Sequence, residues 1–316
     1  MNMKNELPPA VIIAGPTASG KSGLALALAD EFGGTIINAD SQQIYRDLPI
    51  LSARPDAAEM ARVPHRLYGF LDAAERGSVA PWRELAEAEI AATIAAGRLP
   101  LLVGGTGLYL RALRHGLASV PEIPAEVRAE AAALYQELGG AGFRERLAGL
   151  DPKAAARLPA GDRQRLTRAW EVVRATGVPL HRWQRGTASG APYRFATILL
   201  MPPREALYAA CDARFAAMVV AGALDEVRSL AARGLSPDLP AMKGVGVRDL
   251  LAHLRGEMTL DEAVAAGQMA TRRYAKRQIT WFRHQVTADL TIEQQYSPDL
   301  LPDIGRFIRE FRLTGR

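Results

Sequence analysis

Short apolar runs alternate with longer segments that carry apolar residues at helical spacing, early in the chain and again after residue 190. Runs of this length, bounded by Gly, Pro or polar residues, predict buried strands. We expect these strands at Val11–Ala14, Thr35–Asn38, Leu99–Val103 and Phe195–Leu200. Helices are expected over Leu24–Ala29 and from Pro81 to about Ala96, where Gly97 follows. Strands that alternate with helices predict an α/β protein with a parallel sheet covered on both faces.

The interval 115–192 has a different pattern, rich in Ala, Leu and Arg and interrupted by prolines. It predicts an all-helical insertion between two strands of the sheet. We therefore expect a sheet core made of residues 1–114 and 193–316, with a helical insertion domain at 115–192. Beyond Pro203 the pattern is helical again to about Arg283, and a frayed tail is expected after it.

The composition is that of an ordinary globular protein. Of 316 residues, 48% are hydrophobic and 23% charged, which is enough for a substantial core. The single cysteine, Cys211, excludes a disulfide framework and suits a reducing compartment. No run approaches the roughly 18 apolar residues of a membrane span, and the first residues do not resemble a signal peptide. We expect a cytoplasmic protein and a monomer, with no membrane partner, while the net charge of +5 permits a polyanionic one.

The motif GPTASGKS follows the first predicted strand and precedes the first predicted helix. This is the context of a P-loop, whose glycines let backbone N–H groups surround phosphate oxygens at a helix N-terminus. The Lys21 ammonium would reach the outer phosphates, and the Ser22 hydroxyl would contact Mg²⁺. We expect phosphate contacts along the whole loop, at Gly15, Pro16, Thr17, Ala18, Ser19, Gly20, Lys21 and Ser22. The motif therefore predicts a P-loop NTPase-like core that binds a phosphate chain and Mg²⁺.

Two further strand ends carry candidate chemistry. Asp40 follows the second strand, and ligands of doubly wound sheets sit at the carboxyl ends of strands. Its carboxylate could hold a metal-bound water, take a proton from a nucleophile, or cap the next helix. After Val103, where a typical P-loop NTPase has an acidic residue for Mg²⁺, this chain has GGTG at Gly104–Gly107. The reaction is therefore expected to differ from hydrolysis. The GGTG segment suits either the close approach of a bulky substrate or a tight strand-to-helix turn.

Two basic regions could contact a polyanion. In the first, the polar residues of Gln164–Arg168 point away from the apolar positions of a helix, although a solvated face would look the same. The second is a helix that the capping box Thr259–Glu262 begins and that runs to about Arg283. Its cations span roughly 140° of arc, with no acidic residue after the capping box to offset them, which favours phosphate binding. These cations are Arg272, Arg273, Lys276, Arg277 and Arg283.

Six segments, spread over nearly the whole chain, carry a family resemblance. They are GPTASGKS at Gly15–Ser22, ADSQQIYR at Ala39–Arg46, GGTGLYL at Gly104–Leu110, DPKAAARLPAGDRQRLTRAWEV at Asp151–Val172, ARFAAMVVAGALDEV at Ala213–Val227 and TRRYAKRQITWFR at Thr271–Arg283. In this order the set resembles the tRNA dimethylallyltransferases (isopentenyl-diphosphate:tRNA transferases). DSQQIYR and TRRYAKRQITWFR are the most specific segments. The chain departs from the family's usual pattern at residues 48–55, 65–66 and 246–248.

The resemblance implies transfer of a dimethylallyl group from dimethylallyl diphosphate to N6 of the adenosine 3′-adjacent to the anticodon, in tRNAs that read codons beginning with U. The P-loop would then hold the diphosphate of the prenyl donor rather than ATP. Lys21, Mg²⁺ and Arg214 would stabilise the charge that grows on the leaving diphosphate. Asp40 would accept the proton of the attacking amine, and Thr17 would line the channel where the two substrates meet.

The resemblance also implies contacts with tRNA. The target adenine must leave its stack to reach the channel, and Gln42 and Gln43 could recognise its edge. The helical insertion would grip the anticodon arm, and the cationic helix would hold the RNA backbone. We expect tRNA contacts at Asp40, Ser41, Gln42, Gln43, Thr106, Arg128, Gln164, Arg165, Leu166, Thr167, Arg168, Lys243, Arg248, Arg272, Lys276 and Arg277.

Two other functions stay open from the residues alone. A small-molecule or nucleotide kinase would use the same loop on ATP, and it also places an aspartate after the second strand. Such a kinase has no need of a basic helix. A nucleotide-dependent RNA-binding module would keep the basic helix without any chemistry.

Overall fold

The computed structural model describes residues 7–184 and 189–314. These residues form two compact units. One unit contains the described chain up to Arg114 and from Ala191 onward, and the other is His115–Gly190. The chain thus leaves the larger unit once, between the fourth and fifth strands of its sheet, and returns to complete it.

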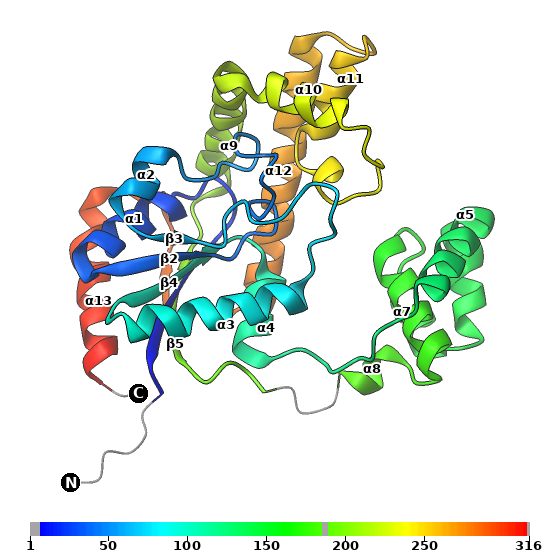
Figure 1. Cartoon of the computed structure of the whole chain (residues 1–316), viewed down its shortest axis with the longest axis horizontal. Helices are drawn as coiled ribbons and strands as arrows, with labels where there is room; N and C mark the ends of the chain where they lie inside the picture. The colour runs from blue at the N-terminus through cyan, green and yellow to red at the C-terminus, as the bar shows by residue number, and fades with distance from the viewer. Residues whose placement is uncertain (1–6, 185–188, 315–316) are drawn as a thin grey trace. The chain divides into compact units, whose positions relative to one another are not determined.

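The larger unit is built on a six-stranded parallel sheet with the strand order β3-β2-β4-β1-β5-β6 (Figure 1). The strands are β1 (Pro9–Ala14), β2 (Gly34–Asn38), β3 (His65–Arg66), β4 (Leu99–Gly104), β5 (Arg194–Leu200) and β6 (Leu290–Ile292). Four of them are the predicted strands, so the parallel α/β fold is confirmed. The edge strands β3 and β6 have two and three residues, which is too short for a periodicity to predict them.

Helices cover both faces of this sheet. Those of the larger unit are α1 (Lys21–Phe32), α2 (Ala57–Arg62), α3 (Val79–Ala95), α4 (Gly107–His115), α9 (Arg204–Met218), α10 (Leu224–Ala232), α11 (Val247–Leu254), α12 (Leu260–Gln285) and α13 (Leu301–Leu313). Val11 and Ile13 of β1 pack with α1 and α13 on one face, whereas Ile12 packs with Trp82 of α3 on the other. A strand buried on both faces requires the continuous apolar run that the sequence shows.

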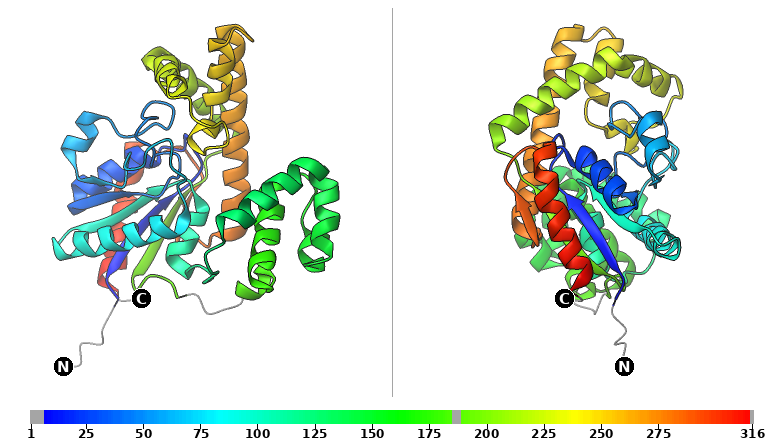
Figure 2. Two further views of the ribbon diagram at one scale, coloured as in Figure 1. Left: turned by 45° about the vertical axis from the view of Figure 1, so that its right-hand side comes forward. Right: turned by 90° about the vertical axis from the view of Figure 1, so that its left-hand side faces the viewer.

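The helix α12 runs through much of the larger unit, with α9 and α11 packed against it (Figure 2). Thr259 and Glu262 form the predicted capping box at its start. Its inner side includes Gly267, where a Cβ atom would lie 2.1 Å from the ring of Phe215 on α9. Glycine is therefore required for the close approach that places the Phe215 ring between the two helices.

The described chain after α12, up to Thr314, forms a strand and a helix, so the predicted frayed tail is wrong. β6 pairs with β5, and α13 packs beside α1. Between them, the Gln295 side chain donates a hydrogen bond to the Ala18 carbonyl at 3.0 Å, and the Tyr296 amide donates to the Ser19 carbonyl at 3.4 Å. These partners lie about 277 positions earlier in the chain, so local sequence patterns could not indicate them.

One helical run among the described residues, Arg204–Ala232, is long and apolar enough to cross a membrane by length and composition alone, with a mean hydropathy of 1.5. This corrects the expectation from the sequence that no segment is long and apolar enough to cross a membrane. The run carries Asp212 and Arg214 and changes conformation at Gly222, whose φ is 104°. Asp212 pairs with Arg272 of α12, so this charge makes a contact within the unit.

The smaller unit consists of short packed helices. They are α5 (Ala125–Ala148), α6 (Pro152–Arg157), α7 (Arg163–Thr176) and α8 (Leu180–Trp183). Phe143, Leu166 and Trp170 are buried in its core. α5 turns sharply at Gly139, whose φ of 63° and ψ of 179° are not helical, and α5 packs against α7.

Candidate active site

The loop after β1 has the conformation that a phosphate-binding loop requires. Gly15 and Gly20 have φ angles of 152° and 90°. A Cβ atom would lie 2.5 Å from the Leu200 carbonyl oxygen at Gly15 and 2.8 Å from the Tyr296 side chain at Gly20, so only glycine fits either position. Gly20 immediately precedes α1, and the free N–H groups of that helix therefore open onto the loop.

Lys21 stands at the start of α1 with its ammonium turned back over the loop. Its Nζ donates a hydrogen bond to the Pro16 carbonyl at 2.7 Å. Burial lowers the pKa of Lys21 to about 8, while the Asp40 carboxylate opposes this shift and the Arg214 guanidinium adds to it. An ammonium in this situation is stabilised when an anion such as a phosphate approaches.

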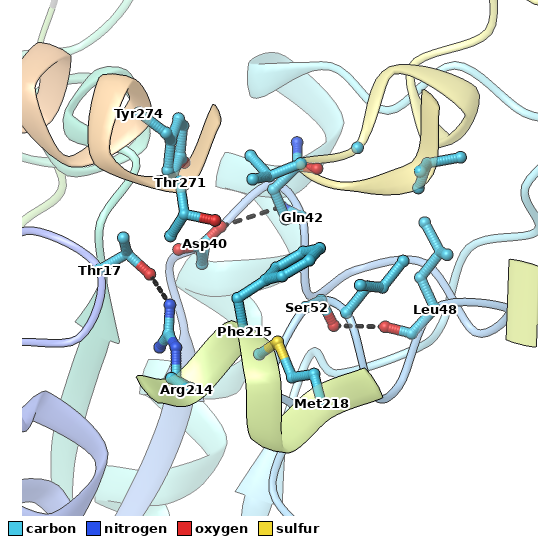
Figure 3. Close-up of a pocket in the computed structure, with 14 residues that line it drawn as sticks. Thr17, Asp40, Gln42, Leu48, Ser52, Arg214, Phe215, Met218, Thr271 and Tyr274 are labelled. Atoms are coloured by element: carbon cyan, nitrogen blue, oxygen red, sulfur yellow. Dashed lines mark hydrogen bonds between the residues drawn. The ribbon is translucent and has the colours of Figure 1, made fainter. Parts of the chain in front are cut away.

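Beside the loop lies a pocket with one polar end and one apolar end (Figure 3). Its lining residues are Thr17, Asp40, Gln42, Leu48, Leu51, Ser52, Arg214, Phe215, Met218, Gly244, Val245, Val247, Thr271 and Tyr274. Figure 3 shows Arg214 reaching Thr17 from α9, with Asp40 near its guanidinium, Tyr274 beyond Asp40, and Met218 further along the helix. The pocket thus places hydrogen-bonding groups next to a surface that suits a hydrocarbon chain.

Asp40 is held in a fixed turn at the end of β2. The buried Asn38 side chain accepts a hydrogen bond from the Asp40 amide at 2.9 Å and donates one to its carbonyl at 3.1 Å. The Asp40 carboxylate accepts from the Gln42 amide at 2.9 Å. The residues that follow form turns and not a helix, so the helix-cap alternative is wrong and the carboxylate faces the pocket.

Arg214 and Thr17 meet across the polar end. The guanidinium donates a hydrogen bond to the Thr17 hydroxyl, and its Nε is buried without a partner among the described residues. Burial lowers the pKa of Arg214, and the nearby Cys211 and Asp40 oppose this shift. Arg214 and Lys21 therefore bring two positive charges to one place, where they favour an anion.

Tyr274 is a pocket residue that sequence reasoning did not single out. Burial, and then the nearby Asp40 carboxylate, raise the pKa of its phenol well above the ordinary range, whereas a hydrogen bond with Thr106 lowers it. The Thr106 hydroxyl in turn accepts from the Ser41 amide at 2.9 Å and donates to the Ser41 hydroxyl at 3.1 Å. Thr106 and Ser41 therefore tie together the ends of β4 and β2, beside a neutral phenol.

The GGTG segment makes room for α12. A Cβ atom would lie 2.1 Å from the Gln278 amide at Gly105 and 2.1 Å from the Trp281 ring at Gly107. At Gly104 it would lie 2.1 Å from the Ala39 carbonyl oxygen. The glycines therefore serve internal packing at a strand-to-helix turn, the second of the two interpretations that the sequence left open.

The family model for IPP transferases matches residues 43–285. The chain belongs to this family.

Named relatives agree with this assignment. The chain is 60% identical to the "tRNA dimethylallyltransferase" of Rhodospirillum centenum over 89% of this chain and 90% of that protein. It is 55% identical to the "tRNA dimethylallyltransferase" of Paramagnetospirillum magneticum over 99% and 100% of the two chains.

Solved structures share the fold. The full-length tRNA isopentenylpyrophosphate transferase of Bacillus halodurans aligns with a TM-score of 0.71 and 34% identity, covering 98% of this chain and 97% of that one. A eukaryotic dimethylallyltransferase acting on tRNA aligns with a TM-score of 0.81 and 23% identity over 96% and 79% of the chains. The second likeness concerns the fold alone.

Two segments line the pocket that do not follow the motif pattern expected of the family. Residues 48–55 contribute Leu48, Leu51 and Ser52, and residues 246–248 contribute Val247. The first segment is fixed by Glu226 of α10, whose carboxylate accepts from the amides of Ile50 and Leu51 at 2.6 and 2.9 Å. No local pattern could predict this contact, because Glu226 lies 176 positions after Ile50.

Gln43 holds this same segment. Its Nε2 donates to the carbonyls of Ser52 and Ala53 at 3.0 and 2.7 Å. Gln42, by contrast, lines the pocket. The expected role of Gln43 at the adenine edge is therefore corrected to support of the loop, while Gln42 keeps its place beside Asp40.

Leu166 is fully buried in the core of the smaller unit, so its side chain cannot contact RNA and that prediction is corrected. The polar residues of this region lie on the surface of the unit, but some of them already have partners within the unit. Arg128 and Gln164 are exposed, Arg165 pairs with Asp162 at 3.4 Å, Arg168 pairs with Glu171 at 3.6 Å, and the Thr167 hydroxyl donates to the Arg163 carbonyl at 2.9 Å.

On α12, Arg272 forms an ion pair with Asp212 of α9, which offsets its positive charge. The prediction that no carboxylate balances the cationic face is therefore wrong for this residue. Lys276 and Arg277 are exposed, and the Arg277 guanidinium lies over the Tyr274 ring, 5.5 Å from its centroid. Elsewhere in the larger unit, Arg248 is exposed and Lys243 pairs with Asp238 at 2.9 Å.

The residues near the loop fit a magnesium ion only together with a phosphate ligand. Ser22 is exposed at the second position of α1. Within residues 7–184 and 189–314, no group of three His, Cys, Asp or Glu side chains could hold a metal. Mg²⁺ commonly keeps several waters and binds through substrate phosphates with few protein ligands, and the Ser22 hydroxyl suits that arrangement.

Proposed function

We propose that this protein transfers a dimethylallyl group from dimethylallyl diphosphate to N6 of the adenosine 3′-adjacent to the anticodon, in tRNAs that read codons beginning with U, and releases diphosphate. The observation that carries the proposal is the pocket in which Asp40 lies with the Thr17–Arg214 pair beside an apolar lining. The names of the relatives, which are tRNA dimethylallyltransferases, support the same reaction.

The P-loop side of the pocket would hold the diphosphate. When the C–O bond of the prenyl donor breaks, its electron pair goes to the diphosphate, whose negative charge increases. Lys21 and Arg214 bring fixed positive charge to this place, and a buried charge stabilises such a transition state more strongly than one in water. Thr17, bonded to Arg214, would line the passage between the two substrates.

Asp40 would act as the general base. The exocyclic amine of adenine attacks the first carbon of the prenyl group and forms the new C–N bond. The amine then carries one proton too many, and the Asp40 carboxylate would accept it. The Gln42 amide donates a hydrogen bond to this carboxylate, and the Asn38 side chain bonds to the backbone amide and carbonyl of Asp40. The apolar residues Phe215 and Met218 suit the hydrocarbon chain.

We propose Mg²⁺ as the cofactor, held by the Ser22 hydroxyl and by diphosphate oxygens. The ion supplies positive charge that neutralises the leaving diphosphate when it is bound. The protein's own contribution is the hydroxyl at the start of α1 and the N–H groups of the loop.

The tRNA would bind through its backbone and through one flipped base. Exposed Lys276 and Arg277 on α12 suit phosphate contacts, and Gln42 suits the edge of the adenine. For the helical unit, a grip on the anticodon arm is supported by exposed Arg128 and Gln164. We further propose that the protein acts as a cytoplasmic monomer, a location that suits its single, buried cysteine.

Unmodified tRNA, incubated with labelled dimethylallyl diphosphate or with ATP, tests the proposal. We expect label to enter the tRNA without ATP, at the adenosine beside the anticodon. Stoichiometric ADP formation would instead support a kinase. The kinase is already disfavoured, because β4 ends in Gly104 and leads into Gly105 and Thr106, with no acidic residue for Mg²⁺ at that point.

A further inference from the structure

Gln278 lies buried in α12 and joins two parts of the active site. Its Oε1 accepts a hydrogen bond from the Thr17 amide at 2.8 Å, and its Nε2 donates to the Gly105 carbonyl at 2.9 Å. The residue is 6% exposed. Because the donor and the acceptor of the amide each have a partner, only one orientation of the side chain satisfies both.

The first of these bonds fixes the P-loop at Thr17. The backbone of Thr17 is held by Gln278, and its hydroxyl is held by Arg214. One N–H of the loop is therefore bonded to the protein and does not point to a phosphate. The position of the Arg214 guanidinium depends on the same residue, because it bonds to the Thr17 hydroxyl.

The second bond reaches the strand ends that carry the proposed base. A Cβ atom at Gly105 would lie 3.3 Å from the Asp40 carboxylate, so this carbonyl belongs to the immediate surroundings of Asp40. The same Cβ atom would lie 2.1 Å from the Gln278 amide, so a glycine is needed at position 105 for the Gln278 contact. Gln278 thus spans from the diphosphate side of the pocket to the base side.

We propose that Gln278 is a positioning residue for the transfer reaction, which sets the distance between the Thr17–Arg214 pair and Asp40. The inference rests on the proposed function of this pocket. Gln278 acts through Thr17 and Gly105 and does not line the pocket itself. In this role Gln278 lowers the activation barrier of prenyl transfer, because it keeps Arg214, which acts on the diphosphate, and Asp40, which acts on the amine, in one geometry.

The first test is Gln278→Met, which keeps the length of the side chain and removes both hydrogen bonds. We expect the single-turnover rate of prenyl transfer to fall on the order of 10²-fold, the usual effect of a small misplacement of reacting groups. The affinity for tRNA should stay within about threefold of the parent value, because the exposed cations of α12 remain. Gln285→Met, at the exposed end of the same helix, is the matched control and should keep the parent rate.

The second test is Gln278→Glu, which separates positioning from a general loss of stability. Below the pKa of the new carboxyl group, its protonated form can still accept from Thr17 and donate to Gly105. Above it, the carboxylate faces the Gly105 carbonyl and repels the nearby Asp40. We expect the rate of Gln278→Glu relative to the parent to rise at least tenfold as the pH falls through this pKa, while the relative rate of Gln278→Met stays flat.

The outcomes are distinguishable. A parent protein that transfers no prenyl group would overturn the proposed function and this inference with it. A parent that transfers normally, together with a folded Gln278→Met within threefold of its rate, would overturn the inference alone. If Gln278→Met does not fold, the pH dependence of Gln278→Glu decides, and a flat relative rate contradicts positioning.

Discussion

The guanidinium of Arg214 on α9 donates a hydrogen bond to the Thr17 hydroxyl of the P-loop, across 197 positions of sequence. This contact combines the phosphate-binding loop and a helix from the second half of the chain in one site. The Asp40 carboxylate lines the same pocket. In the proposed reaction these neighbouring groups would have opposite tasks: the cations would stabilise the leaving diphosphate, and the carboxylate would accept the proton of the amine.

Asp40→Asn should lower the single-turnover rate about 10²- to 10⁴-fold, the usual contribution of a general base. The amide keeps the shape of the side chain and can still accept from the Gln42 amide, but it cannot take a proton. Affinity for the prenyl diphosphate should change little. Rapid-quench measurement of prenyl transfer checks this, and a rate within tenfold of the parent contradicts the role as base.

Binding of the prenyl diphosphate should weaken with rising pH. The pKa of Lys21 is lowered to about 8 by burial, and a bound diphosphate raises it again. The free protein therefore loses this charge as the pH rises through about 8, and the dissociation constant should increase up to about tenfold per pH unit above that value. Titration of an unreactive diphosphate analogue between pH 7 and 10 measures the effect.

Lys21→Arg supplies the control for that titration, because a guanidinium keeps its charge throughout this range. Its dissociation constant should vary little with pH, whatever its absolute value. An equal pH dependence in the parent and in Lys21→Arg would assign the titration to another group.

Lys276→Ala should make the slope of log K for tRNA binding against log salt concentration shallower by about one, since one exposed phosphate contact is lost. Arg272→Ala is the comparison on the same helix, because Asp212 already offsets its charge. We expect a smaller change of slope for Arg272→Ala. Filter binding at several salt concentrations distinguishes the two, and equal slopes for both variants would contradict the assignment.

Leu166→Ala should destabilise the smaller unit by about 2–5 kcal/mol, the range for truncating a fully buried leucine. Urea unfolding measures this loss. At a temperature where the variant is folded, its affinity for tRNA should match the parent. A loss of affinity without a loss of stability would restore the RNA contact that the sequence suggested.

The sheet core, the P-loop and the family could all be predicted from the order of the residues alone. Buried strands of five or more residues and a loop that needs glycines leave local patterns, because their physical requirements are met by neighbouring residues. Asp40 was predictable for the same reason, since its place after β2 follows from the strand itself.

The roles of the remaining groups became visible only in the folded protein. Gln278 bonds to Thr17, Glu226 supports the 48–55 segment, and Asp212 offsets Arg272. Each of these roles depends on a partner that another element of the fold brings close. The sequence shows which side chains can donate, accept or carry charge, but which of them are already satisfied inside the protein is set by packing between elements far apart in the chain.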